Sequence, residues 1–236
     1  GKPIAYTVKE VNTPDGYTAT YGEGSLVVTN THTPETTSKT VTKVWEDNNN
    51  QDGKRPQSVS MQLLADGSPV GASVSLNEQS GWSYTWNDLP VYQNGEAVTY
   101  TVTEVAVPTG YSVSYSDDGF TVTNTYAPEV TAKTIQKVWD DQNNQDGIRP
   151  DSVNMQLYAD GERLGDEVTL SNETNWAYTW SNLPVYKDGA KINYSVQEVN
   201  TPDGYLAIYS ADGFVITNQH TPAVTERSVT KVWDDN

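Results

Sequence analysis

The chain has 236 residues, no cysteine and a formal net charge of −17. The missing cysteines exclude disulfides and cysteine-ligated metals, and the negative charge argues against nucleic acid or an anionic membrane surface as a partner. No apolar run is long enough to cross a bilayer and no signal-peptide pattern occurs, so we expect no membrane insertion. The 15 Tyr and 7 Trp, with frequent Gly and Pro, favour β-strands, tight turns and small aromatic cores.

About seven strands are expected in a unit that begins near residue 36 and ends near residue 128. They lie near Thr40–Trp45, Ser58–Ala65, Ser73–Leu76, Trp82–Trp86, Val98–Val105, Tyr111–Ser116 and Phe120–Tyr126. Turn signals such as Asp66-Gly67 and Asp117-Asp118-Gly119 separate these segments. Short strands at this spacing, without helical periodicity, predict an all-β fold of the β-sandwich type.

The sequence repeats itself with a period of 94 residues. The segment KVWEDNNNQDGKRP begins at Lys43, KVWDDQNNQDGIRP begins at Lys137, and KVWDDN begins at Lys231. A segment ending in Glu-Val and a closing Thr-Asn segment recur at the same spacing. The chain is therefore predicted to be part of a tandem array.

The period divides the chain into four predicted parts. Residues 36–128 and 129–222 are complete repeats, residues 1–35 are the C-terminal part of a preceding repeat, and residues 223–236 are the first strand of a following repeat. The linkers TPETT and APEVT are short and contain proline, which predicts limited freedom between the repeats.

Strand parity places three polar residues on apolar faces in every unit, because alternate residues of a strand share a face. In the first complete unit these are Lys43 in the first strand, Glu104 in the fifth and Asn124 in the last. The equivalents in the second complete unit are Lys137, Glu198 and Asn218. The partial repeats carry Glu10, Asn30 and Lys231 at the equivalent positions.

A buried charge or amide is costly unless it is paired, so the three residues are expected to satisfy one another. Desolvation lowers the pKa of a Lys and raises that of a Glu. A neutral amine can attack the Asn side-chain carbonyl, while a protonated Glu donates a hydrogen bond to that carbonyl and passes a proton to the leaving ammonia. The product is an amide that links the first strand to the last, and the Glu acts once per domain, so no enzyme with turnover is expected.

Each of these residues has a plainer interpretation when it is considered alone. A strand Lys commonly guards a sheet edge, a Glu is commonly a surface charge, and an Asn commonly serves a turn.

The loop that begins at Asn48 could hold calcium, but Asn48 and Val59 stand where the calcium-loop pattern requires acids. The Trp82, Tyr84 and Trp86 stripe could stack on a sugar, although a stripe of period two is more typical of a core. We expect no cofactor and no metal.

The patterns KVWxDxxNQDGxRP, YTVTE followed by PxGY, and the closing TNTY resemble the Cna protein B-type repeat of Gram-positive surface adhesins and pilins, over essentially the whole chain. The resemblance implies tandem prealbumin-like, inverse-immunoglobulin sandwiches in which a Lys–Asn isopeptide bond forms beside a catalytic Glu. By motif, it implies cross-linking roles for Lys43, Asn124, Lys137 and Asn218, and catalytic roles for Glu104, Glu198 and Glu10. Asn30 and Lys231 would belong, with Glu10, to incomplete triads.

The resemblance also implies a function. It predicts the extracellular stalk of a bacterial cell-wall-anchored adhesin, with neighbouring repeats as partners and a host ligand held by other domains. The alternative is a binding module that recognises a host protein or glycan through its own surface. Such a module should show an exposed aromatic cluster or a loop that differs sharply between the repeats.

Overall fold

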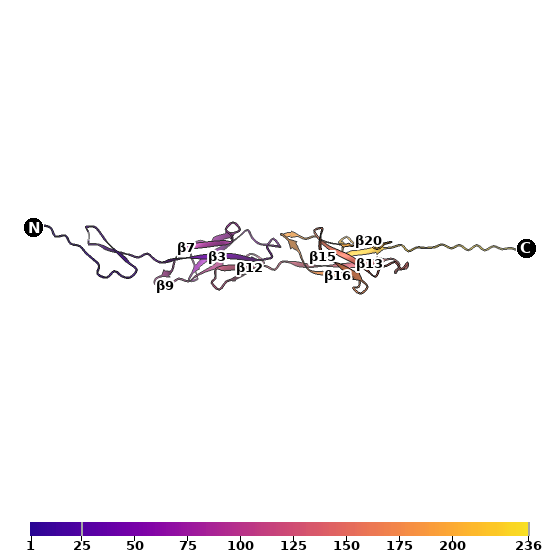
Figure 1. Ribbon diagram of the computed structural model, residues 1–236, viewed down its shortest axis with the longest axis horizontal. Helices are drawn as coiled ribbons and strands as arrows, with labels where there is room; N and C mark the ends of the chain where they lie inside the picture. Colours follow the sequence, from indigo (N-terminus) through magenta and orange to yellow (C-terminus); the bar gives the residue numbers. More distant parts are fainter. Residues whose placement is uncertain (25, 236) are drawn as a thin grey trace. The chain divides into compact units, whose positions relative to one another are not determined.

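The computed structural model describes residues 1–24 and 26–235. Ser25 and Asn236, which fall in the predicted partial repeats, lie outside the described residues. The described part of the chain contains strands and turns only, which confirms the all-β prediction (Figure 1). It offers no helix that could span a membrane. The chain separates into two compact units, Gly1–Asp47 with Arg55–Tyr126, and Asn48–Lys54 with Ala127–Asn236.

The first unit contains a sandwich of two sheets, and the predicted strands are all present. One sheet has the order β11-β12-β3-β7 and the other the order β10-β4-β5, with β6 also paired to β4. The bounds are β3 Thr36–Glu46, β4 Ser58–Ala65, β5 Ser68–Pro69, β6 Val74–Asn77, β7 Ser83–Pro90, β10 Tyr100–Glu104, β11 Ser112–Tyr115 and β12 Thr121–Thr125. A short hairpin joins β8 Tyr92–Gln93 to β9 Glu96–Ala97.

The core of this unit lies between the two sheets because alternate residues of both turn inward. The fully buried side chains include Val41 of β3, Met61 and Leu63 of β4, Leu76 of β6 and Val122 of β12. Aromatic residues such as Trp45, Trp82 and Trp86 pack around this cluster.

The second unit repeats this arrangement. Its sheets have the orders β16-β13-β21-β20 and β15-β14-β19. The bounds are β13 Val130–Asp140, β14 Ser152–Ala159, β15 Glu162–Ser171, β16 Ala177–Pro184, β19 Tyr194–Glu198, β20 Leu206–Tyr209 and β21 Val215–Gln219, with a hairpin of β17 Tyr186–Lys187 and β18 Ala190–Lys191. The single strand β15 stands where the first unit has the two shorter strands β5 and β6.

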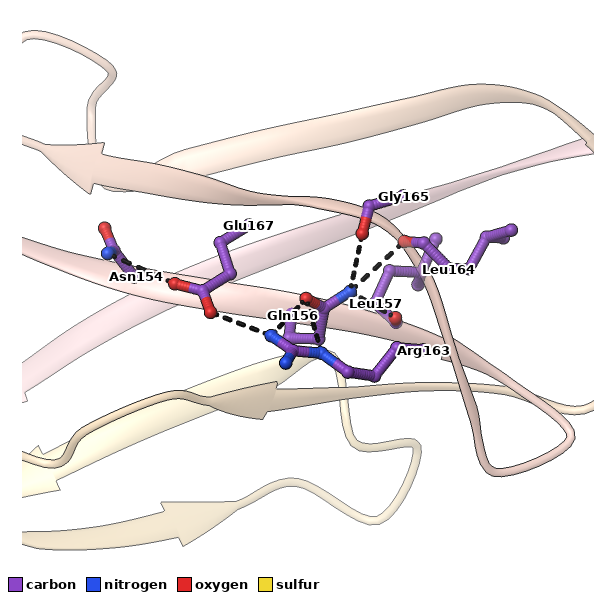
Figure 2. A network of polar contacts seen from close by, with 7 residues as sticks. All are labelled: Asn154, Gln156, Leu157, Arg163, Leu164, Gly165 and Glu167. Carbon is purple, nitrogen blue, oxygen red and sulfur yellow. Dashed lines mark hydrogen bonds and ion pairs between the residues drawn. The ribbon is translucent and has the colours of Figure 1, made fainter.

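A buried glutamine organises the edge formed by β14 and β15 (Figure 2). The pairing of these strands shifts register between Met155 and Leu157, and the register gives Gln156 no partner residue in β15. Gln156 lies at this shift, and its Nε2 donates hydrogen bonds to the carbonyls of Leu157, Leu164 and Gly165 at 2.8, 3.2 and 3.2 Å. Arg163 donates to Oε1 of Gln156 at 2.9 Å and pairs with Glu167 at 2.8 Å.

The first unit keeps only part of this network. Nε2 of Gln62 donates to the carbonyls of Leu63 and Val70 at 2.9 and 3.1 Å. Pro69 occupies the position of Arg163, so the side-chain ion pair of the second unit has no equivalent at this position. The glutamine is therefore the common element, and the Arg–Glu pair is an addition.

The partial repeats are less regular. In the N-terminal segment β1 Thr18–Tyr21 pairs with β2 Val28–Thr31. The described residues 223–235 form no strand, and the assignment of residues 223–236 to the first strand of a following repeat stays a prediction. A segment that finds no partner strand leaves its N–H and C=O groups to water and has no sheet to join.

Candidate functional site: a buried Lys, Glu and Asn in each sandwich

The first and last strands of each repeat lie side by side and run parallel. In the first unit, β12 pairs with β3 so that Val122 is opposite Lys43 and Asn124 is opposite Trp45. Lys43 and Asn124 are thus close on neighbouring strands of one sheet. Glu104 ends β10 of the other sheet, opposite Met61. All three side chains lie in the core, with exposed fractions of 4%, 6% and 0% for Lys43, Glu104 and Asn124.

The carboxyl and the amide contact each other directly. Nδ2 of Asn124 donates a hydrogen bond to Oε1 of Glu104 at 3.1 Å. Oε2 of Glu104 and Oδ1 of Asn124 are buried and have no hydrogen-bond partner. The carboxyl was predicted to face the amide carbonyl, whereas the structure places the amide nitrogen there. That nitrogen is the group that would leave as ammonia, so the carboxyl stands where a proton is needed.

The lysine amine is held by backbone carbonyls and an indole ring. Nζ of Lys43 donates to the carbonyls of Val44 and Val122 at 3.0 and 3.1 Å and lies 4.4 Å from the centroid of the Trp45 ring. Burial lowers the pKa of Lys43 to about 8, partly opposed by the charge of Glu104. Burial also raises the pKa of Glu104, against the opposing effects of Asn124 and Lys43. Both shifts favour the uncharged forms of the pair.

The second unit has the same constellation. Nδ2 of Asn218 donates to Oε1 of Glu198 at 2.9 Å, and Nζ of Lys137 donates to the carbonyls of Val138 and Ile216 at 3.1 Å each. Burial lowers the pKa of Lys137 to about 8, opposed by the charge of Glu198. One contact differs, because Oγ1 of Thr201 donates to Oε2 of Glu198 at 3.2 Å.

The residues of the partial repeats are not buried in this way. Nδ2 of Asn30 donates to Oε1 of Glu10 at 3.0 Å in an exposed setting. Lys231 is exposed, and its Nζ lies 3.3 Å from the centroid of the Trp233 ring. Among the described residues 1–24, 26–35 and 223–235 no hydrophobic side chain is buried, so no core encloses the Lys or Glu there.

A second buried polar cluster, which was not predicted from the sequence, lies beside the triad. The carboxylate of Asp47 is buried, accepts a hydrogen bond from Nε of Arg55 at 3.0 Å and accepts another from the hydroxyl of Tyr111 at 2.9 Å. The Arg55 guanidinium also lies 5.5 Å from the centroid of the Trp45 ring, the ring that covers the Lys43 amine. The cluster therefore packs against the same indole that covers the amine.

The second unit repeats this cluster with Asp141, Arg149 and Tyr205. Nε of Arg149 donates to Asp141 at 2.8 Å, as does the Tyr205 hydroxyl. The hydrogen bond from Arg149 holds the pKa of Asp141 well below its usual range, and burial next to Asp141 raises the pKa of Tyr205 to about 12. The available sequence signal was the recurrence of Asp and Arg at fixed places in KVWxDxxNQDGxRP.

The structure also bears on the alternatives raised by the sequence. The described residues gather no group of three or more His, Asp or Glu side chains that could hold a metal ion. Asn48 and the next two asparagines adopt positive φ angles of 50° to 60°, a conformation that Asn tolerates better than most residues. Trp82 and Trp86 pack against the core, while Tyr84 at the sheet edge is 43% exposed. Two of the three aromatic side chains of the stripe are therefore partly buried against the core.

Two sandwiches with parallel first and last strands, each enclosing a Lys, a Glu and an Asn, define a tandem of β-sandwich repeat domains. The Cna protein B-type domain matches residues 39–125 and 133–219. The chain belongs to the Cna protein B-type family, as the resemblance predicted.

The relatives agree with this assignment. A collagen adhesin of Staphylococcus aureus is 43% identical over 247 aligned residues, which cover 100% of this chain and 20% of the adhesin. The crystal structure of two B repeat units of the collagen binding protein of S. aureus is 40% identical and superposes with a TM-score of 0.74, over 89% of this chain and 55% of that chain. This chain thus corresponds to a fifth of the adhesin's length, and its fold is that of two B repeats.

Proposed function

We propose that this chain is a structural spacer from the stalk of a bacterial cell-surface adhesin, and that each complete repeat closes itself with a Lys–Asn isopeptide bond. The similarity to the B repeats of a collagen binding protein supports the spacer role. The repeats serve as one another's partners, and a host ligand is held by other parts of the adhesin. Anchoring to the cell wall belongs to a region outside this chain.

The observation that carries the cross-link is the buried contact of 3.1 Å between Nδ2 of Asn124 and Oε1 of Glu104, next to a lysine whose pKa burial lowers. The neutral Nζ of Lys43 attacks Cγ of Asn124, and the bond from Cγ to Nδ2 breaks. Glu104 accepts a proton from Nζ and delivers one to Nδ2, which leaves as ammonia. Packing supplies the effective concentration of the reacting groups.

The product joins β3 to β12, the two strands through which the chain enters and leaves the sandwich. By the chain-entropy model for cross-links, a closed loop of about 80 residues contributes on the order of 4–5 kcal/mol of stability. The carboxyl acts once in each domain, so the chemistry serves the domain's own architecture and not an external substrate.

The mass of the intact protein tests the proposal. Each bond releases one ammonia, so the wild-type chain should weigh about 34 Da less than the sum of its residues. Glu104→Ala should reduce the deficit to about 17 Da, because only the second repeat can still react. Lys54→Ala, which removes an exposed lysine, is the matched control and should keep the full deficit. A wild-type mass equal to the sequence sum would reject the cross-link.

A binding function of the repeats themselves has less support. The aromatic residues that could have formed a sugar platform, Trp82 and Trp86, pack against the core.

A further inference from the structure

The two triads differ at one position, three residues after the glutamate. In the second repeat the hydroxyl of Thr201 donates to Oε2 of Glu198 at 3.2 Å. In the first repeat the equivalent residue is Val107, and Oε2 of Glu104 is buried without a hydrogen-bond partner. In the N-terminal partial repeat Thr13 donates to Oε2 of Glu10 at 3.3 Å, so the hydroxyl contact recurs wherever a Thr is present.

The other groups that face each glutamate are matched. A lysine and an asparagine approach from the first and last strands in both repeats. The backbone N–H of Glu104 donates to the hydroxyl of Tyr115 at 3.2 Å, and that of Glu198 donates to Tyr209 at 3.3 Å. The nearby Asp–Arg pairs also have the same geometry in both repeats. The two repeats therefore differ in the contacts of the glutamate carboxyl at one position, which is Val107 in the first repeat and Thr201 in the second.

The contact bears on the reaction because a hydroxyl that donates a hydrogen bond stabilises a carboxylate more than a neutral carboxyl. A charged Glu next to a charged Lys is an unreactive ion pair, since the protonated amine has no lone pair for attack. The reactive arrangement is the neutral amine beside the neutral carboxyl. Thr201 therefore stabilises the unreactive pair in the second repeat, while Glu104 has no such contact in the first.

We propose that the residue three positions after the glutamate sets the rate of cross-linking, so that the first repeat, with Val107, closes its bond faster than the second, with Thr201. This inference rests on the proposed isopeptide function. Thr201 acts through the carboxyl of Glu198 and is a positioning residue. A hydrogen bond to a charged group is worth on the order of one pKa unit, so we expect about a tenfold difference in rate.

The test follows both bonds in one full-length chain that has never folded, assembled from synthetic segments in denaturant. The chain is diluted into buffer, samples are quenched over time, and a protease digest is analysed by mass spectrometry. The peptide pair that contains Lys43 and Asn124 reports on the first repeat, and the pair that contains Lys137 and Asn218 reports on the second. Tryptophan fluorescence recorded in parallel gives the folding rate.

The exchanged variants make the test specific. Thr201→Val should speed the second bond about tenfold, and Val107→Thr should slow the first by a similar factor. Thr201→Ser keeps a hydroxyl and should retain the slow rate. Val107 is 38% exposed and Thr201 is exposed, so these near-isosteric changes spare the core.

Rescue by the hydroxyl separates this role from a merely structural one. Thr201→Val should speed the second bond and Thr201→Ser should keep it slow, while the folding rate of both variants stays that of the wild type. If the two bonds form at equal rates in the wild-type chain, or if Thr201→Val and Val107→Thr leave the rates unchanged, this inference is overturned and the proposed function stands. Failure of both bonds to form in a folded chain would instead overturn the proposed function.

Discussion

A lysine in a protein core destabilises the fold as long as it is charged and unpaired. Lys43 and Lys137 meet this problem with backbone carbonyls, an indole ring and a nearby carboxyl, and burial still lowers the pKa of each to about 8. The proposed bond removes the problem by turning the amine into an amide. Before the bond forms, the free energy of unfolding should depend on pH through the protonation of these two buried lysines.

The first prediction concerns a chain that cannot cross-link, carrying Asn124→Ala and Asn218→Ala. Its lysines have a pKa of about 8 in the folded state and 10.5 in the unfolded state. Between these values the unfolded chain binds more protons than the folded chain, so the free energy of unfolding should rise as the pH rises from about 8 towards 10.5. Urea denaturation followed by tryptophan fluorescence at several pH values measures this slope.

The wild-type chain is the control, because under the proposed function its two lysines are amides that no longer titrate. Its unfolding free energy should lack this contribution over the same pH range. A slope identical in the two proteins would contradict the assignment of Lys43 and Lys137 as the reacting amines.

The triad residues could be located by sequence, but their neighbours could not. Lys43, Glu104 and Asn124 lie in strands, where alternation states which way a side chain faces. Asp47 and Arg55 flank an irregular loop, where alternation carries no information, and the partner Tyr111 comes from 64 residues away. Only the tertiary fold brings that tyrosine to the carboxylate. The orientation of the Asn124 amide is likewise a property of packing.

At the scale of elements, turn residues fixed most of the strand boundaries, whereas strand partners were set by the tertiary fold. Asp66-Gly67 and Asp117-Asp118-Gly119 separate strands as predicted. The start of β3 at Thr36 was missed because Thr36 pairs with Pro90 of β7, a long-range partner. Local sequence also does not reveal that β3 and β12 pair in parallel. Nor does it reveal that one continuous strand, β15, replaces the two shorter strands β5 and β6 of the first unit.

The second prediction tests the edge of the second sandwich. Gln156→Ala removes the buried donor shared by the carbonyls of Leu157, Leu164 and Gly165, and the loss of such hydrogen bonds costs about 0.5–1.5 kcal/mol each. Glu167→Ala is the matched control, since it removes the exposed ion pair with Arg163, worth about 0–1 kcal/mol, and keeps the hydrogen bond from Arg163 to Gln156. Hydrogen exchange of β15 and urea denaturation measure both. Equal effects of the two changes would show that the ion pair, and not the glutamine, holds this edge.

At the scale of the whole molecule, the positions of the two linked strands decide how a pulled chain responds. Within the first repeat the chain enters along β3 and leaves along β12, and these strands are parallel neighbours. Tension therefore loads them in shear, and the proposed bond between Lys43 and Asn124 would carry that load past the intervening strands. It would shield the stretch of about 80 residues between the two positions.

The third prediction is a force–extension measurement on the full chain. An extended residue spans about 3.4 Å, so each shielded segment would add roughly 270 Å if it were released. The wild-type chain should show no step of this size, Glu104→Ala should show one, and Glu104→Ala with Glu198→Ala should show two. Steps of full length in wild-type protein would mean that its repeats are not cross-linked.

The parallel pairing of first and last strands also bears on how such a protein evolves. Each sandwich is completed by strands from its own 94-residue period, and none of the described sheets borrows a strand from the other unit. Recombination between repeats can therefore delete or duplicate a whole period without opening the sheets of the copies that remain. The number of repeats can therefore change during evolution, and with it the length of the array, while the core of each repeat stays the same.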